Sequence, residues 1–256
     1  MIRRMHTILS IINWIRRREI VVLLAVLVAV LGTWAFIMLA DAVKEKGTQN
    51  IDERIIIALR RPENRAIPIG PPWLHEVGRD MTALGGVAVL SGLTLVVAGF
   101  LLMRKQYHAL WLVLIATFGG LALSTLLKSI IARDRPSVVP HLSYVTTSSF
   151  PSGHSMLAAV AYLTLGSLLA RLVVEWRVKI YILVVALMIT FLVGVSRVYM
   201  GVHYPTDVLA GWAAGLVWAS ICWLVARALQ QRGHVEPPTE ATPTGENIPV
   251  ATTHRA

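Results

Sequence analysis

Long apolar runs separated by short polar segments form the main pattern of the chain. Six runs reach the roughly 20 residues that an α-helix needs to cross the hydrocarbon core of a bilayer. They cover residues 20–40, 81–103, 109–131, 155–174, 180–199 and 208–228. Of the 256 residues, 55% are hydrophobic and 15% are charged, which does not suit a soluble domain. We therefore predict an all-α, polytopic membrane protein in which residues 20–230 form one domain with six transmembrane helices.

The basic residues predict how these spans are oriented, because Lys and Arg collect in cytoplasmic loops. Twelve of them lie before the first span, in the second-to-third and fourth-to-fifth connections, and after the sixth span, whereas the loop 41–80 balances seven basic residues with seven acidic ones. The twelve residues are Arg3, Arg4, Arg16, Arg17, Arg18, Arg104, Lys105, Arg171, Arg177, Lys179, Arg227 and Arg232. We place the basic segment 1–19 and both termini in the cytoplasm, and the chain in the plasma (inner) membrane. A cleaved secretory signal is disfavoured, because the first apolar run exceeds the usual length of roughly 7–15 residues.

Four further features refine this prediction. In the outward loop 41–80, Ile51, Ile55 and Leu59 recur at helical spacing, which predicts an interfacial helix. Segment 233–256 lacks the apolar residues that a folded core needs, so we predict a disordered cytoplasmic tail. The net charge of +10 forms no sustained basic stripe, so we expect no nucleic-acid partner. The single cysteine, Cys222, excludes a disulfide framework and is expected to pack with apolar residues.

Three polar clusters fall at the outward ends of spans three to six. They are "KSIIARDRP" (128–136), "PSGH" (151–154) and "SRVYMGVHYPTD" (196–207). Lys128, Arg135 or Arg197 alone could be a snorkelling residue at a helix end. Together with two histidines on the same membrane face, these three cations favour an anion site. Arg forks match phosphate oxygens, and Lys adds a mobile point charge.

The second and third clusters add groups suited to phosphoryl chemistry. Ser152 is a predicted N-cap, so that the N–H groups of the following helix would point at a bound anion. Pro205 fits the first position of the last helix. Asp207 follows His203 by four residues and can reach back to the imidazole, fixing its tautomer and leaving the other nitrogen free to attack. His154 is a candidate general acid.

We interpret the other polar and aromatic residues near these motifs as non-catalytic. We interpret Arg133 and Asp134 as a local ion pair or as charges at the rim of the site. Tyr199 and Tyr204 are expected to be interfacial aromatics, though either could border the site. His141 is interpreted as a solvated loop residue.

Taken together, the clusters resemble the three signature motifs of the type 2 phosphatidic acid phosphatase superfamily. That superfamily also includes vanadium haloperoxidases and bacterial acid phosphatases. The first motif is Lys, six residues, then Arg-Pro; the second is Pro-Ser-Gly-His; the third is Ser-Arg, five residues, His, three residues, Asp. The motifs span residues 128–207, and the six-span layout extends the resemblance over roughly 20–230.

The resemblance implies a lipid phosphatase with its active site at the extracytoplasmic helix ends. His203 would attack phosphorus to form a phosphohistidine, His154 would protonate the leaving group, and Asp207 would orient His203. The implied phosphate-binding residues are Lys128, Arg135, Ser152, Gly153 and Arg197. The implied reaction would need no metal and no cofactor, because cations and a helix end would supply the electrostatic stabilisation. The candidate substrates are undecaprenyl diphosphate, phosphatidylglycerophosphate and phosphatidate.

The same sequence features allow three alternative functions. The same site could pass phosphate to a second lipid, acting as a phosphotransferase. Vanadate-dependent halide oxidation uses a similar pocket but is disfavoured in a membrane bundle of this kind. A non-catalytic transporter or lipid-binding protein would favour charges deep within several spans or paired halves, and the sequence has neither. The expected partners are the bilayer and a lipid phosphate, with no obligate protein partner.

Overall fold

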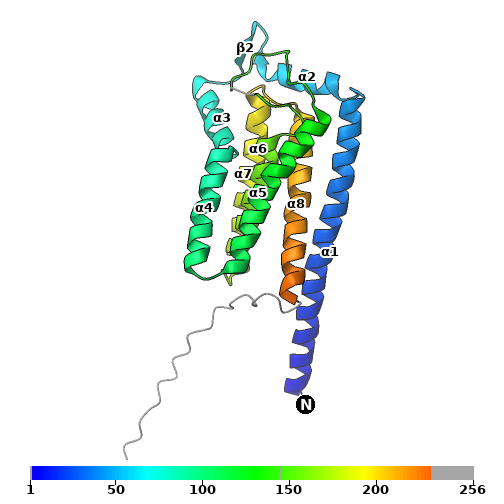
Figure 1. Cartoon of the computed structure of the whole chain (residues 1–256), viewed down its shortest axis with the longest axis vertical. Helices are drawn as coiled ribbons and strands as arrows, with labels where there is room; N and C mark the ends of the chain where they lie inside the picture. The colour runs from blue at the N-terminus through cyan, green and yellow to red at the C-terminus, as the bar shows by residue number, and fades with distance from the viewer. Residues whose placement is uncertain (1, 144–145, 232–256) are drawn as a thin grey trace, which may run out of the picture.

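The apolar runs of the sequence fold into long helices, and a short helix and a hairpin lie across one end of them (Figure 1). This computed structural model describes residues 2–143 and 146–231, with the backbone alone for 2–18 and 231. The helices are α1 (Ile2–Lys44), α2 (Gln49–Ala58), α3 (Pro72–Leu84), α4 (Val87–Met103), α5 (Tyr107–Ile131), α6 (Gly153–Arg171), α7 (Trp176–Tyr199) and α8 (Pro205–Gln231). Strands β1 (Arg60–Arg61) and β2 (Asn64–Pro68) form the antiparallel hairpin. The predicted tail 233–256 lies outside the described residues.

Among the described residues, five helices are individually long and apolar enough to cross a membrane. The bent pair α3–α4 provides a sixth span if it is taken as one, with a bend of 49°. The prediction of one continuous helix over 81–103 is therefore wrong. The break falls at Gly85 and Gly86, in an otherwise apolar run. A Cβ on Gly85 would overlap Val193 and would lie 3.2 Å from Cβ of His154, so neighbouring helices pack directly against the backbone here.

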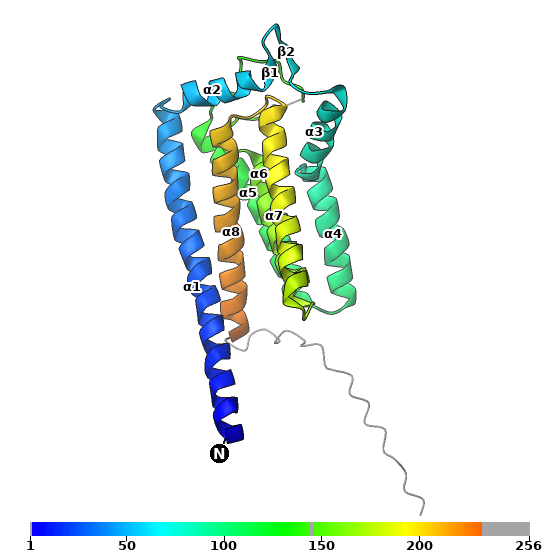
Figure 2. The ribbon, with the colours of Figure 1, turned by 180° about the vertical axis from the view of Figure 1, so that it is seen from behind.

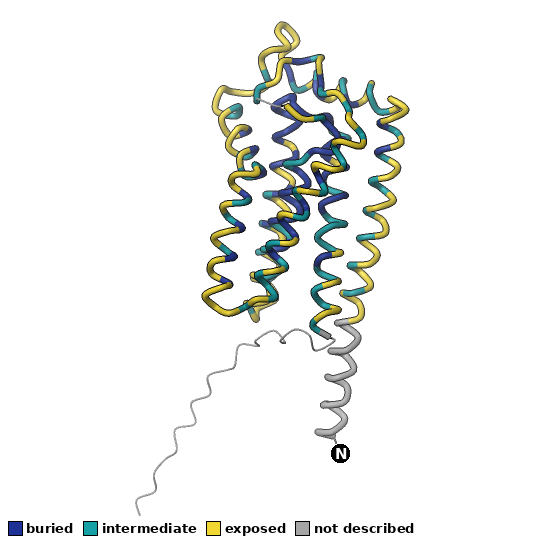
Figure 3. Tube along the Cα trace, viewed as in Figure 1, coloured by how far each residue is buried: buried dark blue, intermediate teal, exposed yellow. Residues whose placement is uncertain are grey.

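Helix α6 lies at the centre of the bundle and packs against α5, α7 and α8. Helix α1 packs along α8, whereas α3 contacts α7 and α4 contacts α5. Seen from behind, α1 and α4 stand at opposite edges, and α1 continues beyond the other helices at the end far from α2 (Figure 2). Buried residues follow α6 and the end beneath α2, while outward faces expose large apolar side chains such as Leu23, Val96 and Phe191 (Figure 3). Such outward faces suit contact with lipid.

Two glycines one turn apart allow α8 to approach the start of α6. A Cβ on Gly211 would lie 2.6 Å from the carbonyl oxygen of Ser152, and a Cβ on Gly215 would lie 2.7 Å from that of Met156. Small residues at such positions let helix backbones come close. The contact includes a hydrogen bond of 2.9 Å from the N–H of Ser152 to the carbonyl of Asp207. This packing joins the second and third polar clusters.

We expect Gly211→Ala to destabilise the protein by about 1–3 kcal/mol, because the added methyl group must displace backbone. Thermal unfolding of the purified protein measures the change. Gly92→Ala is the matched control, because a Cβ there meets nothing within 4 Å. Equal unfolding temperatures for Gly211→Ala and wild type would contradict the close approach of α6 and α8.

The loop 41–80 contains the expected helix, α2, which buries a side that the sequence analysis did not single out. Ile51 and Ile55 are exposed, whereas Asp52 and Ile56 are 1% and 0% exposed. Because Asp52 and Ile56 are four residues apart, they share one side of the helix. This side faces the bundle, and a carboxylate is therefore buried at the end of the helices.

The hairpin that follows α2 was not predicted from the sequence. In its register, Arg60 lies opposite Pro68. The side chain of Arg60 is buried, and its Nη1 donates to the carbonyl of Tyr199 at 3.0 Å. Since Tyr199 is the last residue of α7, the guanidinium stabilises the negative end of that helix dipole.

Candidate active site

The three polar clusters meet at the end of the bundle that α2 covers. Helices α5 and α7 end there, and Lys128 and Arg197 lie in their last turns. Helices α6 and α8 begin there, with Gly153 and Pro205 as their first residues. The antiparallel path of the chain thus gathers residues that are up to 79 positions apart, from Lys128 to Asp207.

His203 and Asp207 form the buried centre of this region. Nδ1 of His203 lies 3.6 Å from Oδ2 of Asp207 and 3.5 Å from Oγ of Ser149. The same Oδ2 accepts the N–H of Tyr204 at 2.8 Å and the hydroxyl of Ser149. On the other side of the ring, Nε2 lies 3.4 Å from Nη1 of Arg135. One ring nitrogen therefore faces a carboxylate and the other faces a cation.

Burial decides the ionisation of the histidine in this arrangement. Burial is the main reason that the pKa of His203 falls to about 3. The charges of Arg197 and Arg135 also lower this pKa, whereas the hydrogen bond with Asp207 raises it. Burial also lowers the pKa of Arg135, and the charge of Asp207 opposes this. A neutral imidazole keeps a lone pair, which is the state that a nucleophile needs.

Backbone carbonyls of two loops hold two of the three cations. Nζ of Lys128 donates to the carbonyl of Ser148 at 2.6 Å. Nε of Arg135 donates to the carbonyl of Thr147, and its Nη1 donates to that of Val202, both at 2.7 Å. Arg135 thus connects the segment before the second cluster with the residue just before His203.

Arg197 is the third cation and is 2% exposed. Its Nη1 donates to Oγ1 of Thr82 in α3 at 3.1 Å, and Oγ1 of Thr82 lies 2.8 Å from Oγ of Ser196. Within the described part of the chain, Nε of Arg197 has no hydrogen-bond partner. His154 lies within range of the charges of Arg197, Lys128 and other site residues. The cations and both histidines therefore form one electrostatic unit.

The "PSGH" segment folds as its sequence predicts. Ser152 is the N-cap of α6, and its Oγ accepts the N–H of Ser155 at 3.4 Å and the hydroxyl of Ser155 at 2.8 Å. A Cβ on Gly153 would lie 3.2 Å from Oγ of Ser124 and 3.4 Å from Cε of Lys128. The lysine side chain of the first cluster therefore lies against the helix start of the second.

Comparison with known proteins identifies the family. A family model described as PAP2 superfamily matches residues 109–231. Phosphatidylglycerophosphatase B of Bacillus subtilis (strain 168) is 38% identical over 184 residues, which cover 71% of this chain and 86% of that protein. The chain belongs to the PAP2 superfamily.

Further relatives agree with this family assignment. Lipid A 1-phosphatase of Rhizobium etli is 30% identical over 189 residues, covering 63% of this chain and 76% of that protein. The crystal structure of the first transmembrane PAP2 type phosphatidylglycerolphosphate phosphatase, from Bacillus subtilis, superposes with a TM-score of 0.67 at 32% identity. That match covers 80% of this chain and 96% of the solved one. As a PAP2 member of the membrane branch, the chain is a multi-pass membrane lipid phosphatase that hydrolyses phosphoric monoesters or diphosphates.

Arg133 is bound in this PAP2 site in a way that the sequence interpretation missed. Its Nη2 lies 2.8 Å from Oδ2 of Asp52, and its Nη1 lies 2.7 Å from Oδ1 of Asp207. Burial opposes the charged form of Arg133, but the two carboxylates outweigh burial and raise its pKa. Asp134 is exposed. The interpretation of Arg133 as a rim charge or as the local partner of Asp134 is therefore wrong.

The two tyrosines of the third cluster are buried and not interfacial, and Tyr204 borders the site, which is the alternative that the sequence left open. The ring of Tyr204 lies beneath the Arg133 guanidinium, 4.1 Å from centroid to Cζ, and its hydroxyl accepts from Nε2 of Gln49 at 2.9 Å. The hydroxyl of Tyr199 donates to the carbonyl of Ile69 at 2.9 Å. Both residues attach the end of the PAP2 bundle to the segment 41–80.

Ser149 is a further site residue that sequence reasoning missed. It lies two residues before Pro151 and carries no motif or periodicity of its own. His141 is an exposed loop residue, as interpreted, and its Nε2 contacts the carbonyl oxygen of Pro136 at 2.7 Å.

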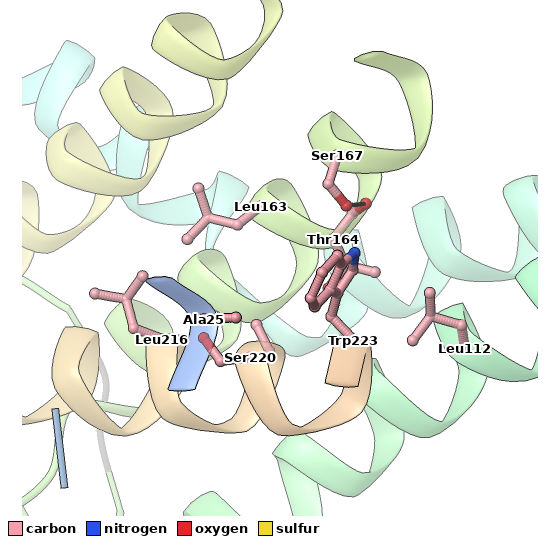
Figure 4. A pocket seen from close by; sticks show the side chains of 9 residues that line it. Ala25, Leu112, Leu163, Thr164, Ser167, Leu216, Ser220 and Trp223 are labelled. Atoms are coloured by element: carbon pink, nitrogen blue, oxygen red, sulfur yellow. Dashed lines mark hydrogen bonds between the residues drawn. The ribbon is translucent and has the colours of Figure 1, made fainter. Parts of the chain in front are cut away.

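A separate cavity of about 180 Å³ lies deeper between the helices of the PAP2 bundle (Figure 4). Its lining includes Leu112, Thr164, Ser167 and Trp223. Thr164 follows Gly153 by eleven residues, which is about 16 Å along α6. None of the lining residues belongs to the predicted catalytic or phosphate-binding set, so this cavity is distinct from the polar site.

Proposed function

We propose that the chain hydrolyses a phosphate monoester or diphosphate of a membrane lipid through a phosphohistidine on His203. The observation that carries this proposal is the placement of the imidazole. Its Nδ1 faces Asp207 at 3.6 Å, and its Nε2 faces Nη1 of Arg135 at 3.4 Å. The carboxylate favours a proton on Nδ1, which leaves the Nε2 lone pair directed at the cation that would hold phosphate.

The proposed reaction has two displacements at phosphorus. In the first, Nε2 of His203 forms a bond to phosphorus while the bond to the lipid oxygen breaks and His154 gives that oxygen a proton. In the second, His154 takes a proton from water, the water oxygen bonds to phosphorus, and the bond to Nε2 breaks. Asp207 stabilises the positive charge on the imidazole in between. The products are inorganic phosphate and the lipid alcohol or, from a diphosphate, the lipid monophosphate.

The charge of the transferring group would be balanced by cations and by a helix end. Lys128, Arg135 and Arg197 would contact the phosphate oxygens, and Ser152 and the N–H of Gly153 would add donors at the start of α6. The unpartnered Nε of Arg197 and the neighbouring Gly153 and Lys128 support this assignment. Fixed cations of this kind do the electrostatic work that Mg²⁺ does in many phosphoryl-transfer enzymes.

We propose that the site faces the extracytoplasmic side of the plasma (inner) membrane and that both termini are cytoplasmic. The connections α4–α5 and α6–α7 lie at the end of the bundle opposite the site. The α4–α5 connection carries Arg104 and Lys105, and the first turn of α7 carries Arg177 and Lys179. Lys and Arg are enriched in cytoplasmic loops, which supports this orientation.

Phosphatidylglycerophosphate is the first substrate to test. Support comes from the 38% identity to a protein named phosphatidylglycerophosphatase B over 86% of its length. Undecaprenyl diphosphate and phosphatidate are the other proposed substrates. A phosphate at the helix ends would leave the acyl or prenyl chains of any of these lipids in the bilayer.

We expect the purified full chain to release inorganic phosphate from at least one of these three lipids. EDTA should leave the rate unchanged, because cations of the protein replace a metal, and vanadate should inhibit, because it mimics the transferring phosphoryl group. Phosphate release is measured with and without each additive. No release from any of the lipids, or complete loss of activity in EDTA, would contradict the proposal. Recovery of the labelled phosphate in a second lipid would indicate phosphotransfer instead of hydrolysis.

A further inference from the structure

Arg133 connects two carboxylates that come from distant parts of the chain. The exposed fractions of the side chains of Arg133, Asp52 and Asp207 are 9%, 1% and 0%. Each carboxylate receives a different nitrogen of the same planar guanidinium, at 2.8 Å for Asp52 and 2.7 Å for Asp207. A guanidinium fork held at both ends has a fixed orientation, so the position of one carboxylate determines that of the other.

Asp52 also binds the first turn of α8 directly. Its Oδ1 accepts the N–H of Thr206 at 3.1 Å, and its Oδ2 accepts the hydroxyl of Thr206 at 2.6 Å. Thr206 is the second residue of α8, and N–H groups at that position have no acceptor within the helix. Asp52 therefore caps α8 from another helix and places a negative charge at its positive end. The next residue of α8 is Asp207.

The contacts of Asp207 divide between its two oxygens. Oδ1 accepts from Arg133, whereas Oδ2 accepts from Ser149 and from the N–H of Tyr204 and faces Nδ1 of His203. Arg133 and the two donors to Oδ2 together fix the rotation of the carboxylate, and this rotation presents Oδ2 to the histidine. Without a partner for Oδ1, the carboxylate could turn and present a different edge to the imidazole.

Helix α2 and the site are connected by a second set of contacts. Oε1 of Gln49 accepts from Nη2 of Arg133 at 3.1 Å, and Nε2 of Gln49 donates to the hydroxyl of Tyr204 at 2.9 Å. The Tyr204 ring in turn covers the Arg133 guanidinium. Asp52 is therefore one part of a packed connection between α2 and the residues on either side of His203.

From these contacts we propose that Asp52 is a positioning residue of the phosphatase reaction, acting through Arg133 and the first turn of α8 on Asp207 and His203. The proposal rests on the proposed function of His203. It assigns a role in catalysis to a helix outside the three signature motifs. Asp52 does not touch the phosphate, so its effect should fall on the rate of the chemical step and not on substrate binding.

The test compares purified full-length Asp52→Asn with wild type in phosphate release from phosphatidylglycerophosphate. We expect kcat to fall by about 100-fold, because small displacements of reacting groups have effects of this size. KM should stay within about threefold of wild type, as expected when a substitution affects the transition state alone. The concentration of each variant is taken from its monodisperse peak in size-exclusion chromatography, and kcat is calculated from that concentration. A partial loss of folded protein therefore does not lower the reported kcat.

Two further variants make the test decisive. Glu63→Gln removes the same charge from the exposed hairpin turn and should behave as wild type. Arg133→Lys keeps the positive charge but loses the fork, and should also lower kcat with little change in KM. If Asp52→Asn yields no monodisperse protein, Arg133→Lys is judged by the same criterion.

The possible failures are distinguishable. A kcat within twofold of wild type for the monodisperse variant, or a raised KM with unchanged kcat, would overturn the role of Asp52 while His203→Ala remains inactive. A wild-type chain that releases no phosphate from any lipid, or a fully active His203→Ala variant, would overturn the proposed function first and this inference with it.

Discussion

His203→Ala is expected to lower kcat for phosphate release by about 10⁴-fold or more, in line with the loss of a nucleophile in other enzymes that form covalent intermediates. Alanine has no lone pair to attack phosphorus, and the cations that remain can only bind the phosphate. The measurement is phosphate release from the lipid substrate at saturating concentration. Because His203 is buried, His203→Gln, which fills more of the same volume, should be made in parallel and should be equally inactive.

His108→Ala provides the control for the loss of a histidine. His108 lies at the start of α5, at the opposite end of that helix from Lys128. Its substitution should leave kcat and KM close to wild type. If both His203 variants are folded and retain kcat within tenfold of wild type, the histidine is not the nucleophile.

Asp207→Asn is expected to lower kcat by about 10³- to 10⁴-fold, the size seen when the carboxylate that orients a catalytic histidine is replaced by an amide in serine proteases. The amide no longer stabilises a positive imidazole. Its NH₂ group must also face one of the groups that now donate a hydrogen bond to Asp207. KM should change little, because Asp207 faces Nδ1 of His203, whereas Arg135, a proposed phosphate-binding cation, faces Nε2 on the other side of the ring. Steady-state kinetics on a lipid phosphate measure both quantities.

The matched control is Asp134→Asn, which removes an equal charge from an exposed residue of the first cluster. Its kinetics should match those of wild type. An Asp207→Asn variant with a normal kcat would contradict the orienting role of the carboxylate, and a loss confined to KM would assign Asp207 to substrate binding instead.

Local patterns in the sequence were sufficient to predict most helices and several features of the site. The apolar runs at 109–131 and 180–199 correspond closely to α5 and α7, because a helix in a bilayer must satisfy its backbone internally and needs a minimum length. Ser152 as an N-cap and Pro205 at the start of α8 are confirmed, because capping preferences depend on a few neighbouring residues.

Contacts between distant segments account for what the sequence did not predict. Arg133 pairs with Asp52, 81 residues before it, and with Asp207, 74 residues after it. The sequence alone favours the adjacent Asp134 as its ion-pair partner, which is wrong. The break at Gly85 and Gly86 interrupts a run whose hydropathy is continuous, and residues of α6 and α7 pack against the backbone at Gly85.

The buried face of α2 shows what a local signal leaves out. Ile51 and Ile55 have helical spacing and predict the apolar side of an interfacial helix, whereas Asp52 and Ile56, with the same spacing one position later, form the side buried against the bundle. The fold buries the second pair, because the carboxylate finds Arg133 and Thr206 there. Asp52 lies four residues before Ile56, and so on the same side of the helix. This spacing is the signal that could have indicated a buried ion pair.

The central claim is that phosphate passes through His203, and trapping the intermediate tests it most directly. Wild-type protein is mixed with a lipid substrate carrying labelled phosphate, the reaction is stopped within one turnover, and the labelled peptide is identified by mass spectrometry. The account predicts a base-stable, acid-labile phosphoryl group on His203 that is absent from His203→Ala. Label on His154, or turnover with no labelled protein in any quenched sample, would contradict it.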